Sequence, residues 1–298
     1  MLDRESTFAN PTIVEFLKKY TVPVAIDQAY QRRQKDTEGK FYRKIVSQSP
    51  RSDADGGTTQ GLYLAAADGT FMGFTNNRDP ERVINMLRSG MRQRVALEAQ
   101  PIKQTSTDQQ YNPQPPDGGL VVRVRARILS GYDEPETRFQ QIFQTALSRD
   151  NLWVTKAEHA DLVAGRFPAT LAVRIARFHL VDNTRGEPPM WKPTEIISHR
   201  FQIQNNTVTG HVELKTASGD RSYAVDLRGN LIVGETGVTT WDMVAKGIFS
   251  GEGQFTRGAP PKPFPLGISF ELADGSDIAD TIPPQGSRGW VDGYLRLR

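Results

Sequence analysis

The chain changes its sequence pattern across one segment, and this change limits the possible folds more than any single motif. Residues 100–119 are rich in Gln, Pro and Thr and show no hydrophobic periodicity, which is typical of a linker. Before this segment, helical and strand-like patterns alternate, whereas strand patterns dominate after it. The 298 residues also exceed what most single cores can organise. We therefore predict two domains, over residues 1–99 and 120–298, joined by a linker over residues 100–119.

The first domain carries clear helix signals. Asn10-Pro11 and Asp79-Pro80 each combine an N-cap residue with Pro at the first helical position. The helix that begins at Pro80 is expected to continue to about Leu97. A further helix is predicted over residues 38–48, with the polar, Gly-rich residues 49–59 forming a loop after it.

Two strand signals lie between these helices. The short apolar run Thr21–Asp27 predicts a buried strand, and Pro23 favours a position at its start or at a sheet edge. Apolar runs on both sides of Asp68-Gly69 predict a hairpin over residues 61–74, because Asp-Gly supplies the positive φ angles of a tight turn. The first domain is therefore expected to be α/β.

The second domain is expected to be mostly β. Leu120–Leu129 alternates strictly, with Arg123, Arg125 and Arg127 on one face, as in a half-buried strand. Helices are predicted over residues 135–147 and from the capping box of Thr155 and Glu158 to near Gly165. Further strands are predicted over residues 170–181, 195–204, 207–216, 221–227, 230–234, 240–249, 266–272 and 290–297. Short connections between strands predict a mostly antiparallel (α+β) domain, a sandwich or half-barrel with two helices on it.

Three short motifs in the first domain occur in an order that is known from one superfamily. They are Asp3-Arg-Glu-Ser-Thr-Phe-Ala-Asn-Pro11, Val22-Pro-Val-Ala-Ile-Asp27, and Gly61-Leu-Tyr-Leu64 followed by Ala67-Asp-Gly69. In this order they resemble a thioredoxin-like domain, and the resemblance covers a third of the chain. It implies a thioredoxin-like α/β fold for residues 1–99.

The chain lacks the residues on which the redox chemistry of that superfamily depends. The superfamily places Cys-x-x-Cys ahead of these motifs and a cis-Pro before the hairpin strand, but this chain has no cysteine and has Thr59-Gln60-Gly61 at the second place. Thiol exchange needs a thiolate of low pKa, so this chain cannot perform it with its own residues. Cysteine-ligated metals and disulfides are excluded for the same reason.

The resemblance also implies that an interior strand of the sheet is missing from the sequence given. Its backbone partners would then lack hydrogen bonds. The strand can be replaced by a segment of the linker or second domain or by a partner chain, which makes a homo-oligomer one alternative. The sheet can instead be rearranged, or an N-terminal piece of the natural protein can carry the strand together with Cys-x-x-Cys.

Composition narrows the functional classes further. A net charge of +3 is too small to indicate nucleic-acid binding by itself. No apolar run approaches 18 residues, so no transmembrane helix is expected. The first residues lack the apolar core of a signal peptide. The sequence as written is therefore expected to be cytoplasmic, or periplasmic or secreted if an N-terminal segment has been removed.

Two loops of the second domain, residues 186–191 and 251–261, are rich in Gly and Pro and have its most unusual sequences. Aromatic rings beside carboxylates suit sugar binding, or glycoside hydrolysis by two carboxyl groups at a fixed distance. Core packing explains each Trp equally well. The candidate ligand-binding residues are Trp191, Glu187, Trp241, Asp242, Glu252 and Arg257.

No motif in the sequence matches a catalytic signature or a cofactor-binding motif, so we expect no cofactor and assign no catalytic residue. His199 and His211, with Glu195 or Glu213, could hold a metal if they share a sheet face, but half-exposed strand residues explain them better. We therefore assign no metal site.

The leading functional hypothesis is a non-catalytic binding or scaffold protein. Its partner would be a protein or an anionic or glycan ligand. One alternative is a thiol oxidoreductase whose Cys-x-x-Cys lies upstream of Met1. Another is a carbohydrate-binding or glycoside-hydrolysing protein.

Overall fold

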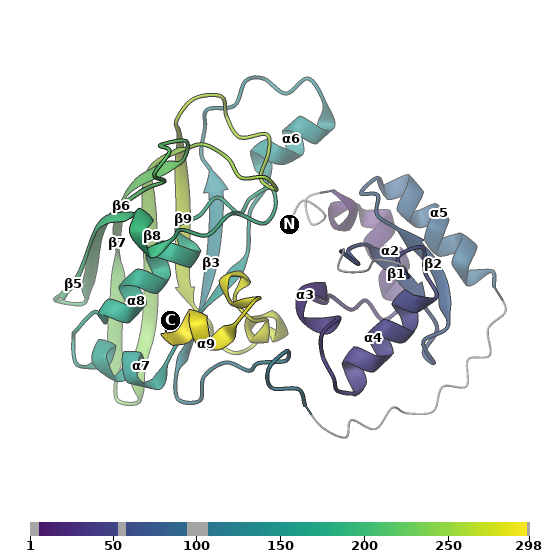
Figure 1. The fold of residues 1–298 in the computed structure, drawn as a ribbon, viewed down its shortest axis with the longest axis horizontal. Coiled ribbons are helices and arrows are strands. Elements are labelled where there is room, and N and C mark those ends of the chain that lie inside the picture. Colours follow the sequence, from purple (N-terminus) through teal and green to yellow (C-terminus); the bar gives the residue numbers. More distant parts are fainter. Residues whose placement is uncertain (1–5, 53–57, 94–106, 297–298) are drawn as a thin grey trace. The chain divides into compact units, whose positions relative to one another are not determined.

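The computed structural model describes residues 6–52, 58–93 and 107–296. Contacts within the chain divide it into two compact units, one within residues 3–113 and one within residues 114–298 (Figure 1). The boundary between the units falls between Pro113 and Gln114. Residues 100–106 of the predicted linker lie outside the described residues.

The N-terminal unit contains short helices and one hairpin. Asn10 caps the first α-helix with its side-chain oxygen, which accepts from the amides of Thr12 and Ile13, so the helix start predicted at Asn10-Pro11 is confirmed. The start predicted at Asp79-Pro80 and the hairpin at Asp68-Gly69 are confirmed as well. The elements are η1 (Thr7–Ala9), α2 (Pro11–Tyr20), α3 (Gln28–Gln31), α4 (Thr37–Ser47), β1 (Leu62–Ala65), β2 (Phe71–Thr75) and α5 (Pro80–Met91).

The core of this unit lies between α2, α5 and the hairpin. Ile13 of α2, Leu64 of β1 and Val83 of α5 are buried against one another, together with Ile84 and Leu87. The i, i+1, i+4 spacing of the α5 residues gives that helix one apolar face, as the sequence predicts. Helix α5 ends at Met91, and the extension predicted toward Leu97 reaches residues that are not described.

The strand predicted over Thr21–Asp27 is wrong. These residues form no strand, and the sheet of the unit contains β1 and β2 within the described part of the chain. Pro23 removes one ladder donor, and no described strand lies beside the run to pair with it. The thioredoxin-like arrangement of this unit stays a prediction.

The C-terminal unit is built on one large sheet. Its strands are β3 (Leu120–Ile128), β4 (Asp150–Val154), β5 (Ile196–Gln204), β6 (Thr207–Lys215), β7 (Ser222–Gly234), β8 (Gly237–Ser250) and β9 (Phe264–Leu272). Its helices are α6 (Arg138–Thr145), α7 (Lys156–Val163), α8 (Ala169–Arg174), the π-helical turn η2 (Ile175–His179), η3 (Pro193–Glu195), η4 (Ile278–Thr281), η5 (Gln285–Ser287) and α9 (Val291–Arg296).

The seven strands are all antiparallel, in the order β4-β3-β9-β8-β7-β6-β5. The turn η2 contacts both β4 and β5, the two outermost strands, so the sheet curls around it. Helices α7, α8 and α9 lie with η2 on the inner face (Figure 1). A mixed α/β architecture with a mostly antiparallel C-terminal sheet is therefore confirmed.

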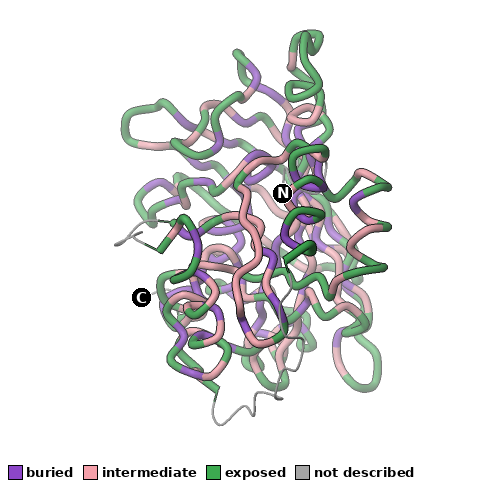
Figure 2. The backbone as a smooth tube through the Cα atoms, turned by 90° about the vertical axis from the view of Figure 1, so that its right-hand side faces the viewer, coloured by how far each residue is buried: buried purple, intermediate pink, exposed green. Residues whose placement is uncertain are grey.

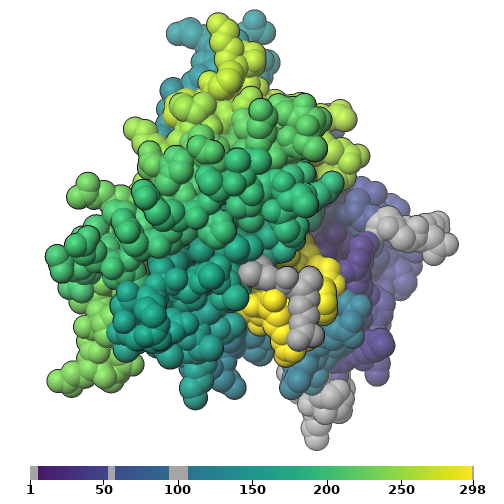
Figure 3. All heavy atoms as spheres, turned by 60° about the vertical axis from the view of Figure 1, so that its left-hand side comes forward, coloured from purple at the N-terminus to yellow at the C-terminus, as the bar shows by residue number. Residues whose placement is uncertain are grey.

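Alternation along each strand separates the core from the outer face. On β3 the residues Val122, Val124, Ala126 and Ile128 are buried, while the arginines between them point outward, as predicted. Buried and exposed stretches alternate in the same way along the chain in Figure 2. In Figure 3 the teal and green part of this unit forms one continuous surface.

Two predicted strands of this unit are helices. Residues 170–181 form α8 and η2, because Pro168 starts a helix and the buried residues Leu171, Ala172, Ile175 and Ala176 follow helical rather than alternating spacing. Residues 290–297 contain α9 instead of a strand. The β-branched residues Thr170, Val173, Ile175 and Val181 favour a strand locally in the first segment, and packing on the sheet decides otherwise.

The remaining strands differ from the predictions in length and number. The strands predicted over residues 221–227 and 230–234 are one strand, β7. Gly229 permits this continuity, since a Cβ there would lie 2.1 Å from the carbonyl oxygen of Asp242 on β8. Strand β4 is not predicted at all, because a five-residue run with three apolar residues carries too little signal.

The segment after β9 covers the outer edge of β4. The Asn151 side-chain amide donates to the carbonyl oxygens of Ala279 (2.8 Å) and Ile282 (2.9 Å), and the amide of Gln285 donates to Asp150 (2.9 Å). An uncovered edge strand would present unpaired amides and carbonyls to other chains. The Trp153 amide donates to the Tyr294 hydroxyl (3.4 Å) and the Trp153 carbonyl accepts from Arg174 (3.3 Å), so side chains satisfy part of the β4 backbone.

One buried guanidinium joins four elements of the unit. Arg174 of α8 is fully buried and pairs with Glu158 of α7 at 2.6 Å. Its Nε atom donates to the Tyr294 carbonyl (3.0 Å), one Nη atom donates to the Trp153 carbonyl (3.3 Å), and the other donates to the Leu295 carbonyl. Thr170 donates to the second oxygen of Glu158 (2.6 Å), so both carboxylate oxygens are satisfied.

Breaking this pair on one side is expected to destabilise the C-terminal unit strongly. Arg174→Met leaves the Glu158 carboxylate buried without its counter-charge, which costs about 3–5 kcal/mol in free energy of unfolding. The double variant Arg174→Met/Glu158→Gln is expected to lose less than Arg174→Met alone. Urea denaturation followed by tryptophan fluorescence measures this, since all four Trp residues lie in this unit.

The matched control is Arg166→Met, which removes the exposed pair with Asp161. Such surface pairs contribute at most about 1 kcal/mol. Equal losses for Arg166→Met and Arg174→Met would contradict the role of the buried pair.

Candidate functional site

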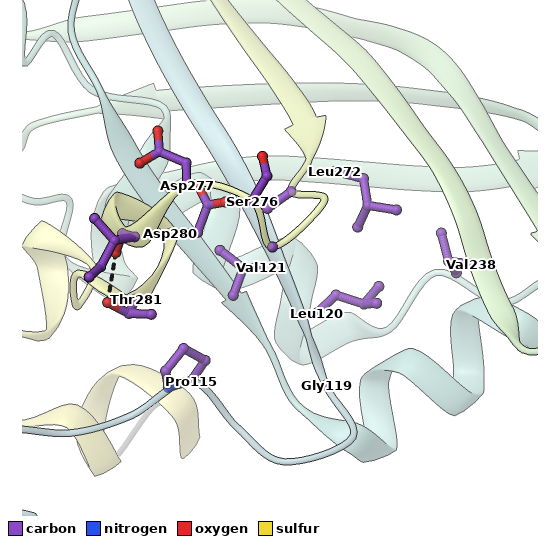
Figure 4. A pocket seen from close by; sticks show the side chains of 13 residues that line it. Pro115, Gly119, Leu120, Val121, Val238, Leu272, Ser276, Asp277, Asp280 and Thr281 are labelled. Carbon is purple, nitrogen blue, oxygen red and sulfur yellow. Dashed lines mark hydrogen bonds between the residues drawn. The ribbon is translucent and has the colours of Figure 1, made fainter.

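A pocket of about 660 Å³ opens at the end of the C-terminal sheet where β3 and β8 begin and β9 ends (Figure 4). Its apolar side is formed by Leu120, Val121, Val238 and Leu272. In Figure 4 Asp277, Asp280 and Thr281 of the loop after β9 lie on the other side of Val121. The polar lining residues are Ser276, Asp277, Asp280 and Thr281.

Arginines of the sheet hold the carboxylates of this loop in place. Arg123 of β3 contacts Asp274 at 2.6 Å and Asp280 at 2.8 Å. Arg149 contacts Asp277 at 2.7 Å and Asp280 at 2.8 Å. The guanidinium of Arg123, on the outward face of β3, therefore has intramolecular carboxylate partners.

The same contacts lower the pKa of two of the loop carboxylates, Asp274 and Asp277. Hydrogen bonds from Ser276 and then from Arg123 lower the pKa of Asp274 to about 2. The hydrogen bond from Arg149 lowers the pKa of Asp277. Asp274, Asp277 and Asp280 give three negative charges against the two positive charges of Arg123 and Arg149, so the polar rim keeps an excess of one negative charge.

The pocket suits an amphipathic molecule, with an apolar part and a polar or cationic part. An apolar part can pack on Val121 and Leu272, while a hydroxyl or cationic group can meet the hydroxyls and carboxylates of residues 276–281. The volume lies within the usual range of about 300–1,000 Å³ for small-molecule sites. The sequence offers no motif for this site, because its walls come from four separate segments.

The predicted tryptophans lie in the core. Trp191 is 1 % exposed, and its ring nitrogen donates to the Leu180 carbonyl (2.8 Å) while the Arg221 guanidinium lies 3.9 Å above its ring. Trp241 is fully buried against Phe167. Neither ring offers a face to a ligand.

The predicted carboxylates occupy different places. Glu187 pairs with Arg288 (3.1 Å), and Glu252 accepts from the Gly258 amide (2.9 Å) within its own loop. Asp242 lies on the outer face of β8, opposite Glu271 of β9. From Asp242 to the end of β8 the strand rises about 26 Å, so Asp242 and Glu252 do not form one pair.

The two predicted loops do come together. Gly186 lies against the Phe255 carbonyl, where a Cβ would be 2.0 Å away, and Gly253 lies against Pro189. Arg257 is exposed in the second loop, and Phe255 is 66 % exposed at its side. The loops therefore form one surface that carries Glu187 and Arg257. Trp191 and Trp241 are buried and do not lie on this surface.

A buried carboxylate, histidine and tyrosine lie in line inside the unit. Asp150 approaches His179 at 3.3 Å, and His179 is hydrogen-bonded to the Tyr294 hydroxyl at 2.7 Å. Burial raises the pKa of Tyr294 well above its usual value. These contacts join β4, η2 and α9. All three side chains are shielded from solvent, so a substrate cannot reach them.

The histidines proposed as a metal pair lie on opposite faces of the sheet. His199 is in register with the buried Val212, whereas His211 is the next residue along β6 and points outward. His211 contacts Asp226 at 2.7 Å and Glu213 at 3.4 Å. Among the described residues no group of three or more His, Asp or Glu is placed to hold a metal ion.

The hydrogen bond that Asp226 accepts from the His211 ring, followed by the one that Glu213 accepts, raises the pKa of His211. Protonated His211 therefore adds stability that is fully present below its ordinary pKa of about 6.5 and is lost as the pH rises through the folded-state pKa. Asp226→Asn is expected to lower the pKa of His211 toward the ordinary value. Titration by NMR measures it, with Asp220→Asn as the control, and an unchanged pKa in Asp226→Asn would contradict the assignment.

Arg177 differs from the arginines around it. Its Nε atom donates to the Trp191 carbonyl (3.1 Å) and its guanidinium lies 4.7 Å from the Phe178 ring. Burial alone lowers its pKa, and no carboxylate within the described residues pairs with it.

No family model, curated protein or solved structure matches this chain. Over the described residues, no helix is both long and apolar enough to cross a membrane.

Proposed function

We propose that this chain is a non-catalytic binding protein whose C-terminal unit holds a small amphipathic molecule in the pocket between β3, the end of β9 and residues 276–281. The observation that carries this proposal is the pocket itself, which joins an apolar wall to a rim of hydroxyls and carboxylates. Its size fits such a ligand.

The placement of ionisable groups supports binding over catalysis. The groups that resemble catalytic machinery, Asp150, His179 and Tyr294, are buried and engaged with one another. The carboxylates considered for glycoside hydrolysis are separated or bound within the protein. A general acid or base must reach the substrate, and none of these groups does.

The oxidoreductase alternative concerns only a longer natural protein. A redox-inactive thioredoxin-like N-terminal domain remains part of the proposal, and it would act as a scaffold. The chain contains no cysteine, so it has no thiol for exchange.

Filling the pocket is expected to weaken the binding of an apolar probe. Nile red, a neutral dye whose fluorescence rises in apolar surroundings, is expected to bind the full chain saturably with one site. Val121→Trp places an indole in the half-buried pocket wall and is expected to weaken binding at least tenfold, about 1.4 kcal/mol. A fluorescence titration measures the dissociation constant.

The control makes the same change on the outer face of β8. Val244 is 53 % exposed and does not line the pocket, so Val244→Trp is expected to leave the titration unchanged. Equal binding by wild type and Val121→Trp would remove the pocket as the site.

A further inference from the structure

The connection between α2 and α3 exposes an alternating apolar stripe. Val22 is 87 % exposed, Val24 is 75 % exposed and Ile26 is 45 % exposed. Residues two apart lie on one side of an extended chain, so these three side chains form a stripe if the segment is extended. β-branched residues at alternate positions are typical of a strand that packs against another strand.

The backbone of residues 21–27 is extended at both ends, which favours pairing with another strand. Thr21 (φ −138°, ψ 167°) and Asp27 (φ −86°, ψ 103°) are extended at the two ends, and Pro23 favours an extended Val22 before it. Among the described residues, 22–26 make no backbone hydrogen bond with another segment. Backbone groups of an extended segment that belong to no described ladder can pair with a partner strand.

We propose that residues 21–27, here called the docking strand, pair with the docking strand of a second copy of this chain. The two strands run antiparallel with their symmetry axis at Val24. This register places Val24 opposite Val24 of the second copy and Val22 opposite its Ile26. Cross-strand pairs of β-branched residues stabilise such an interface.

The single proline fits this register. In an antiparallel pair the residues that exchange hydrogen bonds alternate along the strand. With Val24 as a hydrogen-bonded pair, the amides of Val22, Val24 and Ile26 face the partner, and the ring nitrogen of Pro23 faces away. A shift by one residue would direct Pro23 toward the partner and would cost a hydrogen bond.

Charge at the two ends supports a second copy as the occupant. Lys18 and Lys19 lie in the last turn of α2, just before the docking strand, and Asp27 is the last residue of the docking strand. An antiparallel arrangement brings the basic end of one copy beside the acidic end of the other. A parallel arrangement would place like charges together at each end.

The outer edge of β5 is the other candidate for strand pairing. In the described residues β5 pairs with β6 alone, but its centre is Arg200 and its register is interrupted between Ile196 and Ser198. Symmetric pairing of β5 would set two Arg200 side chains against each other, and the irregularity disturbs the edge. The docking strand has neither obstacle.

A single cysteine tests the register directly, because the 298-residue sequence contains none. Val24→Cys in the full chain is expected to form a disulfide-linked dimer on oxidation with diamide, since opposed residues lie within disulfide range at about 5.5 Å between Cα atoms. Val22→Cys, which faces Ile26 in the proposed pair, is expected to cross-link far less. Equal cross-linking at both positions would overturn the register.

Sedimentation velocity over a range of concentrations tests the association itself. The wild-type chain is expected to dimerise, and Val24→Lys is expected to raise the dissociation constant at least tenfold. Ile197→Lys, a change on β5 at a residue 60 % exposed, is expected to have no effect. A wild-type monomer at all concentrations would overturn the proposal, and so would a dimer lost in Ile197→Lys but kept in Val24→Lys.

Discussion

The Arg174 guanidinium is the interaction on which the C-terminal unit depends. It is fully buried, and its nitrogen atoms contact α7 through Glu158, β4 through the Trp153 carbonyl, and α9 through two carbonyls. A buried charge is tolerated when it is paired and when its remaining donors are satisfied. The contacts of Arg174 meet both conditions, so the closing helix of the chain is tied to the first strands of the sheet. The Asp150, His179 and Tyr294 side chains continue the same connection.

In the C-terminal unit, the residues that stabilise the fold are separate from those that can contact a ligand. The ionisable groups inside the sheet are engaged in holding α7, α8 and α9, and they do not reach solvent. The groups that can meet a ligand lie at the strand ends and in loops, where Arg123 and Arg149 fix the carboxylates of residues 274–280. A rigid sheet that carries adaptable loops is a common basis for binding. The proposed docking strand adds a second surface, in the N-terminal unit, that needs no group from the pocket.

Much of the architecture follows from the sequence, because alternation and capping are local signals. The alternation of β3, the hairpin at Asp68-Gly69 and the helix start at Asn10 are each decided within a few residues. The secondary structure of residues 170–181 and 290–297 is decided by packing against the sheet. Their local sequence therefore gives a wrong prediction of strands. The pocket could not be predicted, since it joins residues of β3, β8 and β9 with a loop that follows β9. Trp191 and Trp241 show the same limit, because sequence alone does not separate a core ring from a binding platform.

Hydrogen exchange of the full chain, measured by mass spectrometry, tests the central claim most directly. If Arg174 ties the closing helix to the sheet, peptides covering residues 291–296 exchange as slowly as those covering β3 and β4 and open with them in one cooperative step. Fast exchange of residues 291–296 while β3 and β4 remain protected would contradict the account, because the last helix would then be dispensable for the sheet.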